Sequence, residues 1–312
     1  MEFPRRTLFL VVSLLLLPAS FASCIFTILN NCPYTVWPGT LAGAGTLELA
    51  STGFRLDPGR TARLAAPPGW SGRLWGRTGC EFDSKGDGVC VTGDCGGKMQ
   101  CAGAGAAPPA TLFEITLGDG QQPDFYDVSL VDGYNLPLAA APRVPIGTCN
   151  ATGCLTDLNS DCPKVLQVLD GNGDGVVACR SACEAFGLDE YCCSGEFANP
   201  SSCKPSYYSG VFKKACPKAY SYAFDDGTST FTCKARDYTI VFCPAFNRWR
   251  RSHGFSSAQP TQGDNGEAPH PHPVDQGEPP YEIPDEGEEP SSASMLSSRL
   301  ILITFFFATL LV

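Results

Sequence analysis

Carboxylates are the only side chains in the cysteine-bearing part of this chain that could carry acid–base chemistry. The three histidines, His253, His270 and His272, all lie beyond the last cysteine, Cys243. A Ser-His-Asp mechanism, a Cys-His mechanism and a histidine-ligated metal centre are therefore excluded between residues 24 and 246. Pairs of Asp and Glu side chains are therefore the remaining candidates for acid–base catalysis. Two carboxyl groups whose pKa values are held apart are what the hydrolysis of a glycosidic bond requires.

One acidic run imitates a calcium-binding loop without completing it. Asp170, Asn172 and Asp174 have the spacing that begins an EF-hand. The twelfth position is Ser181, where an EF-hand needs a bidentate Glu, and no entering helix precedes the run. We interpret the run as a glycine-rich turn before Cys179, and we expect no metal and no other cofactor.

Cysteine content indicates the compartment. Seventeen cysteines lie between Cys24 and Cys243, a density that is typical of disulfide-bonded proteins outside the cell. The first residues agree, because Arg5 and Arg6 precede an apolar run at residues 8–17 and small residues follow up to Ser23. Residues 1–23 are therefore predicted to be a secretory signal peptide.

Short segments rich in β-branched and aromatic residues must position the carboxylates. They occur at residues 25–29, 34–37, 111–117, 125–130, 230–232 and 238–242. Gly, Pro and Asp-Gly separate them, which favours a mainly β fold, an antiparallel β-sandwich. Helix signals are few, and short helices are predicted only at residues 180–186 and 205–215.

The composition changes after Pro244. Residues 252–290 are acidic, lack Lys and Arg and are rich in Pro, Gly and Ser, so residues 247–290 are predicted to be a disordered stalk. Small residues at 291–294, a polar spacer and a hydrophobic run at 300–312 follow. This order predicts a GPI-attachment signal over residues 291–312, with the lipid joined to Ser291 or Ser292. A transmembrane helix is the alternative, but the run is shorter than the roughly 20 residues that span a bilayer.

Several separated motifs point to one family. Residues 86–101 read GDGVCVTGDCGGKMQC, and WGRTGC, DVSLVDGYN, YCC and CPKAYSY stand at residues 75–80, 127–135, 191–193 and 216–222. Over residues 24–245 the chain resembles the thaumatin-like family of plants, the osmotin and pathogenesis-related type. The resemblance implies a thaumatin-like domain at residues 24–246. It comprises a β-sandwich (24–77, 109–155 and 217–246), a small bridged hairpin lobe (78–108) and a disulfide-rich lobe of loops and short helices (156–216).

The resemblance also implies eight disulfides. The implied pairs are Cys32 with Cys243, Cys80 with Cys90, Cys95 with Cys101, Cys149 with Cys233, Cys154 with Cys216, Cys162 with Cys179, Cys183 with Cys192, and Cys193 with Cys203. Cys24 is left over. It is either an unpaired terminal thiol or the site of an intermolecular bridge.

In this family one Arg, one Glu and three Asp line a cleft. The resemblance assigns these roles to Arg77, Glu114, Asp127, Asp132 and Asp225. Repulsion is expected to raise the pKa of at least one carboxyl group, while Arg77 keeps a neighbour ionised. Asp127 and Asp132 would point to opposite faces of one continuous strand, so a turn at Asp132-Gly133 is expected to redirect the second.

The resemblance implies binding of β-1,3-glucan, or a related wall polysaccharide, in defence or in cell-wall processes. A weak endo-β-1,3-glucanase activity is the first alternative, with Glu114 as acid and Asp132 as nucleophile or base. A membrane-permeabilising antifungal protein is the second. A purely structural cluster, in which Arg77 neutralises buried carboxylates, is the third. Binding is favoured, and the question of catalysis stays open.

The expected setting follows from these features. The protein is predicted to be a monomer on the extracellular face of the plasma membrane, held by a GPI lipid and facing the cell wall. Nucleic acid is not an expected partner, because the chain has 32 acidic against 22 basic residues. Asn150 begins the sequence Asn-Ala-Thr, so it is predicted to be N-glycosylated.

Overall fold

The computed structural model of the chain describes residues 23–119, 122–146, 149–245 and 249. The chain divides into two units, residues 1–258 and residues 259–312, and every described residue belongs to the first. The predicted signal peptide, the GPI signal and all of the predicted stalk except Trp249 lie outside the described residues.

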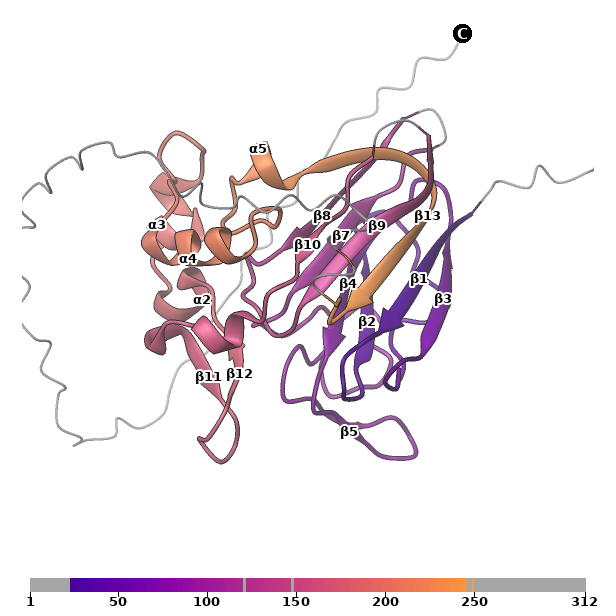
Figure 1. Cartoon of the computed structure of the whole chain (residues 1–312), viewed down its shortest axis with the longest axis horizontal. Coiled ribbons are helices and arrows are strands. Elements are labelled where there is room, and N and C mark those ends of the chain that lie inside the picture. The colour runs from indigo at the N-terminus through magenta and orange to yellow at the C-terminus, as the bar shows by residue number, and fades with distance from the viewer. Residues whose placement is uncertain (1–22, 120–121, 147–148, 246–248, 250–312) are drawn as a thin grey trace, which may run out of the picture. The chain divides into compact units, whose positions relative to one another are not determined.

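A single curled sheet of nine strands forms the body of the domain (Figure 1). Its strands are β1 (Cys24–Asn30), β2 (Trp37–Ala42), β3 (Thr61–Ala66), β4 (Ser71–Arg77), β7 (Leu112–Thr116), β8 (Asp124–Ser129), β9 (Leu138–Ile146), β10 (Thr152–Cys154) and β13 (Phe231–Phe242). The order is β10-β9-β13-β8-β7-β4-β2, and β1 joins β13 to β3. The β1–β13 pair is parallel, whereas the other pairs of this sheet are antiparallel. The prediction of a mainly β sandwich is confirmed.

Strand β13 connects the two layers of the sheet because it pairs with strands of both. Its first residues pair with β8, and the residues from Lys234 onward pair with β9. The layer β10-β9-β13-β1-β3 therefore packs against the layer β8-β7-β4-β2. Aromatic side chains fill the space between them. The rings of Phe26 and Trp70 are 5.5 Å apart, and those of Tyr126 and Tyr238 are 5.1 Å apart. Each such buried side chain contributes about 1.5–3 kcal/mol through the apolar area removed from water.

Several strand predictions need correction. The segments predicted at 230–232 and 238–242 are parts of the one strand β13. The segment predicted at 34–37 lies mostly ahead of β2, which begins at Trp37. Strands β3, β4 and β9 were not predicted. Alanine and glycine are common in these three strands, and such small residues give no β-branched or aromatic signal.

The disulfide-rich lobe carries the helices, which gather beside the sheet in Figure 1. They are α2 (Ala182–Phe186), α3 (Asp189–Cys192), α4 (Tyr207–Ala215) and the 3₁₀ turns Leu158–Asp161, Lys164–Leu166 and Gly195–Phe197, and α5 (Asp226–Ser229) follows the lobe in the sequence. The predicted helices at 180–186 and 205–215 correspond to α2 and α4. Ser206 starts α4 because its hydroxyl accepts from the backbone N–H of Ser209.

A small hairpin in the same lobe contains the acidic run. Strands β11 (Gln167–Leu169) and β12 (Val176–Cys179) are antiparallel. Between them, Asp170 Oδ1 accepts from the backbone N–H groups of Asn172 and Asp174. These bonds close a tight turn, which confirms the interpretation of this run as a turn.

All eight predicted disulfide pairings are confirmed. The Cys32–Cys243 bond spans 211 residues and joins the two ends of the domain. Loop-closure entropy gives about 4–5 kcal/mol for a loop of this length. Cys24 is an unpaired thiol, buried in the main core at the start of β1, and burial raises its pKa to about 12. A buried neutral thiol is inert, which disfavours an intermolecular bridge.

The hairpin lobe and Trp249 cover outer faces of the sheet. In the hairpin lobe, β5 (Glu81–Phe82) pairs with β6 (Gly88–Val89), and the Cys95–Cys101 bond packs on Trp75 and Leu112. On the other layer, Trp249 is buried against Ala139, Ala141 and Val241. The folded domain therefore extends past the predicted boundary at residue 246. Among the described helices, none is long and apolar enough to cross a membrane.

Candidate functional site

Three neighbouring strands place an arginine and two carboxyl groups side by side. Arg73 of β4 lies opposite Glu114 of β7, and Glu114 lies opposite Asp127 of β8. Residues directly opposite each other in antiparallel strands share one face of the sheet. Their neighbours Leu74, Phe113 and Val128 belong to the core, so the three polar side chains occupy the outer face.

Two adjoining cavities of about 490 and 440 Å³ share Arg73, Glu114 and Asp127 in their walls. Together they form one groove, which we call the acidic cleft. The first cavity extends along β2 and reaches Thr116 and the half-exposed ring of Phe125. The second extends toward the disulfide-rich lobe and is bounded by Asp132, Tyr220 and Asp226.

Arg73 bridges two of the carboxyl groups. Its Nη2 lies 3.2 Å from Glu114 Oε1, and its Nη1 lies 3.9 Å from Asp132 Oδ2. Burial raises the pKa of Glu114, Arg73 opposes that rise, and the charge of Asp132 adds to it. Burial therefore favours the protonated form of Glu114, whereas Arg73 favours the ionised form.

Asp127 lies deeper and has no cation of its own. Its Oδ1 is buried and has no hydrogen-bond partner in the described part of the chain. Burial, followed by the charge of Glu114, raises the pKa of Asp127 to about 8, and Arg73 only partly offsets this. The pKa values of the cleft carboxyl groups therefore differ, as expected, and the pKa of Asp127 is raised the most.

A turn brings Asp132 to the same side as Asp127. Gly133 has a φ of 83°, and its N–H donates to the carbonyl of Leu130. A Cβ atom at this position would lie 2.7 Å from Pro109 Cβ and 2.8 Å from the Cys179 carbonyl oxygen. Only glycine fits here. The expected turn at Asp132-Gly133 is confirmed.

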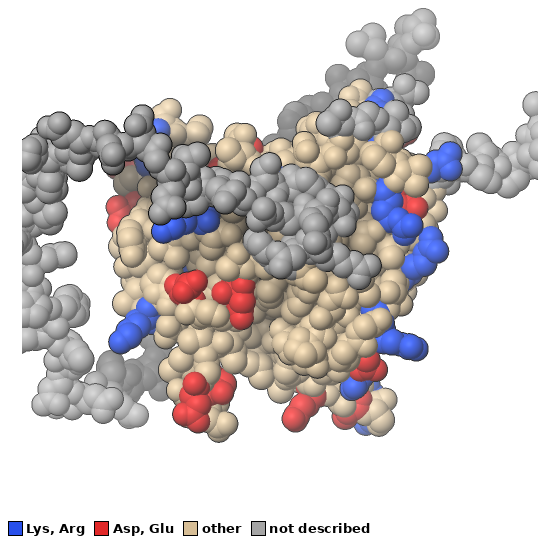
Figure 2. Space-filling view, in the orientation of Figure 1, with Lys and Arg blue, Asp and Glu red and all other residues tan. Residues whose placement is uncertain are grey.

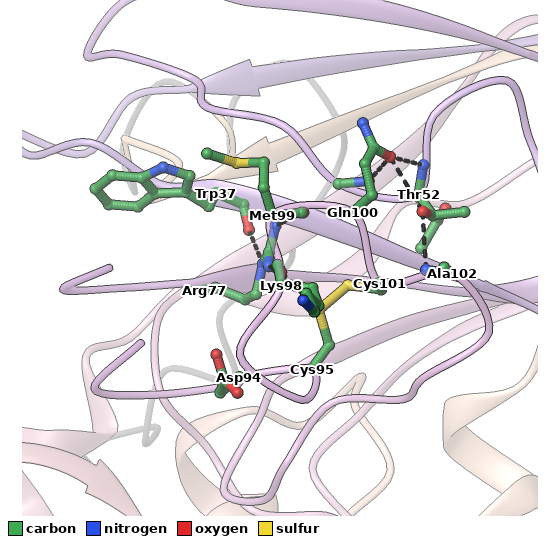
Figure 3. The surroundings of a disulfide bond; sticks show 12 residues. Trp37, Thr52, Arg77, Asp94, Cys95, Lys98, Met99, Gln100, Cys101 and Ala102 are labelled. Atoms are coloured by element: carbon green, nitrogen blue, oxygen red, sulfur yellow. Dashed lines mark hydrogen bonds between the residues drawn. A yellow bond between two sulfur atoms is a disulfide. The ribbon is translucent and has the colours of Figure 1, made fainter. Parts of the chain in front are cut away.

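Arg77 is not in the cleft, which corrects its assignment. It is fully buried under the hairpin lobe and donates to the carbonyl oxygens of Trp37, Pro38, Lys98 and Met99, at 2.7–3.3 Å. Figure 3 shows its guanidinium beside the Cys95–Cys101 bond, with Nη1 3.2 Å from Cys95 Sγ. Burial lowers the pKa of Arg77 to about 10, while Asp94 raises it. Arg73 therefore takes the place in the cleft that was assigned to Arg77.

Asp225 is also displaced from its assigned role. Its Oδ2 accepts from the backbone N–H and the hydroxyl of Ser221 at 2.9 Å each, and Lys213 Nζ lies 2.9 Å away. These bonds fix the chain before α5. The next residue, Asp226, lines the second cavity and accepts from the Tyr220 hydroxyl at 2.8 Å.

The disulfide-rich lobe adds one acidic group that sequence reasoning missed. Glu184 of α2 lies near Arg180, with Nε and Oε1 4.0 Å apart. Burial raises the pKa of Glu184 to about 7, with Arg180 opposing and Asp132 reinforcing the shift. Glu184 therefore extends the acidic surface next to Asp132. No motif in the sequence could have indicated this, because the two residues come from different lobes.

The position of Asn150 is compatible with its predicted N-glycosylation. Asn150 is exposed, and its carbonyl oxygen accepts from the Tyr126 hydroxyl. The threonine of the sequon, Thr152, is buried in β10. The side chain of Asn150 is accessible to a glycan, and its modification stays a prediction.

A sequence comparison identifies the family. The profile of the thaumatin family matches residues 30–244. This chain belongs to the thaumatin family. Pathogenesis-related thaumatin-like protein 3.5 of Cryptomeria japonica is 56% identical over 230 residues, covering 72% of this chain and 94% of that protein. Pathogenesis-related protein 5 of Arabidopsis thaliana is 58% identical over 220 residues, covering 70% and 90%.

A solved structure agrees with the thaumatin fold. The laminaripentaose-producing β-1,3-glucanase in complex with laminaritetraose aligns with a TM-score of 0.50 at 14% identity, over 72% of this chain and 99% of that chain. At this identity the likeness concerns the fold alone. The eight disulfides, the curled sheet and the small helical lobe are thus those of a thaumatin family member.

Proposed function

We propose that this thaumatin family member binds an uncharged β-glucan, β-1,3-glucan in particular, in its acidic cleft. The observation that carries the proposal is the open groove built around Arg73, Glu114 and Asp127, with Phe125 exposed at one end. Carboxylates accept hydrogen bonds from sugar hydroxyls, Arg73 donates, and the ring of Phe125 offers an apolar face to a pyranose.

Charge favours a neutral polysaccharide over an acidic one. Among the described residues that line the cleft, Arg73 is the single cation, and it is already paired with Glu114 and Asp132. A uronic acid polymer would meet repulsion without an available counter-charge. On strands away from the cleft, Arg63, Lys234 and Arg236 are exposed. In Figure 2, several basic side chains gather along the edge that carries β1 and β3.

The setting we propose is the plant cell surface, in defence or in cell-wall processes. Two close relatives carry pathogenesis-related names, and the β-1,3-glucanase of the same fold binds laminaritetraose. Eight disulfides support an extracellular location. The anchoring of the domain by a GPI lipid, through the stalk predicted at residues 247–290, is part of this proposal and rests on sequence alone.

Hydrolysis is a second candidate, and the raised pKa of Glu114 favours it. A carboxyl group with a raised pKa can protonate a glycosidic oxygen, and Asp132, on the other side of Arg73, would serve as nucleophile or base. The same two residues serve binding without catalysis, because both can accept from hydroxyl groups. Product formation therefore distinguishes the two functions.

The test uses a secreted chain that ends at Ala258, the end of the unit containing every described residue. Binding of laminarin oligosaccharides is measured by calorimetry, and reducing ends are followed over a day. We expect saturable binding, no binding of polygalacturonate, and a loss of about tenfold or more in Arg73→Gln, equivalent to about 1.4 kcal/mol. Asp174→Asn, in the β11–β12 turn outside both cavities, is the matched control.

The outcomes distinguish glucan binding from glucan hydrolysis. Binding without new reducing ends supports a lectin-like role. New ends that disappear in Glu114→Gln, with the fold intact, make the protein a slow glucanase. No binding of laminarin by the unmodified chain, or equal binding of polygalacturonate, refutes the proposal of a neutral-glucan site.

A further inference from the structure

Asp127 occupies the centre of the acidic cleft. It lines both cavities, with Phe125 toward one end and Tyr220 toward the other. Strand β8 fixes its position, because β7 on one side and β13 on the other hold the backbone in register. A ligand that follows the groove from one cavity to the other must pass this side chain.

The described neighbours of Asp127 give it only a counter-charge that is shared with other carboxyl groups. Arg73 on β4 is engaged by Glu114 and by Asp132, which lie on its two sides. The other charged group that faces Asp127 is Asp226 of α5. The Tyr220 hydroxyl, a further wall of the second cavity, donates to Asp226 rather than to Asp127. Ionised Asp127 would therefore face two carboxylates and only a shared guanidinium.

Burial of Asp127 also favours its neutral form. Asp127 Oδ1 is buried and accepts no hydrogen bond from any described residue. A carboxylate oxygen in this position loses its hydration without replacement, whereas a neutral carboxyl group loses much less. The raised pKa of Asp127 follows from these contacts.

We propose that Asp127 is the hydrogen-bond donor at the centre of the cleft: its neutral carboxyl group donates its proton to an acceptor oxygen of the bound glucan, while Glu114 and Asp132 accept from hydroxyl groups. The proposal rests on the proposed function and deepens it. Ring and glycosidic oxygens of a sugar can only accept, so a site made of carboxylates alone would leave them unpaired. A neutral carboxyl group at Asp127, beside acceptor oxygens of Glu114, recognises both kinds of oxygen.

The consequence is a particular pH dependence of binding. Tyr220, whose pKa is raised to about 12, stays neutral while Asp127 titrates. With a pKa of about 8, about a tenth of the Asp127 groups keep the proton at about pH 9, and the affinity for laminarin oligosaccharide is then about tenfold lower than at about pH 6. Proton loss at Asp127 therefore weakens binding above neutral pH.

Three variants test this assignment through the ratio of affinities at about pH 6 and about pH 9. Asp127→Asn keeps an N–H donor but cannot titrate, so its ratio falls to about one. Asp127→Ala removes the donor and binds about tenfold or more weakly at both pH values. Asp132→Asn also binds more weakly, but it retains the ratio of about tenfold because Asp127 is intact.

The outcomes separate the donor role from the proposed function. If Asp127→Asn keeps the tenfold ratio, or if the unmodified chain shows no pH dependence, the donor role is refuted while glucan binding stands. If the unmodified chain binds no laminarin at about pH 6, the proposed function is refuted and the donor role with it. Thermal unfolding of each variant at both pH values shows whether a loss of affinity reflects a loss of fold.

Discussion

We predict that Arg73 has the role in the cleft that the sequence assigned to Arg77, and that Arg77 has a structural role. Arg77 is fully buried and donates to four carbonyl oxygens at 2.7–3.3 Å. These acceptors lie at the start of β2 and in the loop closed by the Cys95–Cys101 bond. The guanidinium therefore holds the hairpin lobe on the sheet. Arg73 is partly exposed and contacts carboxylates of the cleft.

Replacement of Arg77 by Gln removes a buried charge and leaves most of the four carbonyl oxygens without a donor. Breaking a buried charged network of this kind costs about 3–5 kcal/mol. For a domain of this size the midpoint of thermal unfolding then falls by roughly 6–20 °C. Arg77→Lys should not restore it, because an ammonium group cannot reach acceptors arranged around a planar fork.

The matched variant is Arg73→Gln. Its salt bridges are half-exposed, so the loss of stability should be about 1 kcal/mol or less, but the affinity for laminarin should fall. Both variants are compared by circular dichroism at one scan rate with disulfides intact, and by calorimetry well below the unfolding midpoint. An Arg77→Gln protein that unfolds within about 2 °C of the unmodified protein refutes the structural role. A folded Arg77→Gln protein that has lost laminarin binding would return Arg77 to the cleft.

Three further changes test other parts of the structure. Asp127 has a pKa of about 8 in the fold against 3.8 normally, so its contribution to stability is complete below about pH 4 and is lost as pH rises to about 8. In urea unfolding, Asp127→Asn should be more stable than the unmodified protein by up to about 5 kcal/mol near pH 8, and equally stable near pH 4. Gly133→Ala would bring its Cβ within 2.8 Å of the Cys179 carbonyl oxygen; unfolding should show a loss of about 2 kcal/mol or more, and calorimetry a weaker affinity for laminarin because Asp132 shifts. Trp249→Ala removes an indole buried on β9 and β13 and should cost about 2–4 kcal/mol in thermal unfolding, whereas no loss would place Trp249 outside the stable domain.

The mainly β fold and the disulfide pattern could be predicted because their signals are local. Cysteine spacing and the motifs around residues 75–101 identify the family, and the family fixes the eight pairings. Asp132-Gly133 could be recognised as a turn, since the odd separation from Asp127 demanded one.

Local sequence signals could not predict which residues line the cleft. Arg73 and Arg77 are four residues apart on one strand, so period-two alternation puts both on the same face. Their roles differ because Arg73 has Glu114 opposite it, whereas Arg77 lies beyond the end of β7 and is covered by the hairpin lobe. Asp225 and Asp226 are adjacent, and only the path of the chain into α5 gives one to Lys213 and the other to the cleft.

The sequence by itself therefore determined the family, the covalent framework and the supply of carboxyl groups, because each is carried by residue type and spacing. Tertiary structure decided which arginine faces the cleft and that the two predicted end strands are one. It also decided that Asp127 Oδ1 is buried without a hydrogen-bond partner among the described residues. Those outcomes depend on strand register and on burial, and both arise only when segments distant in the sequence pack together.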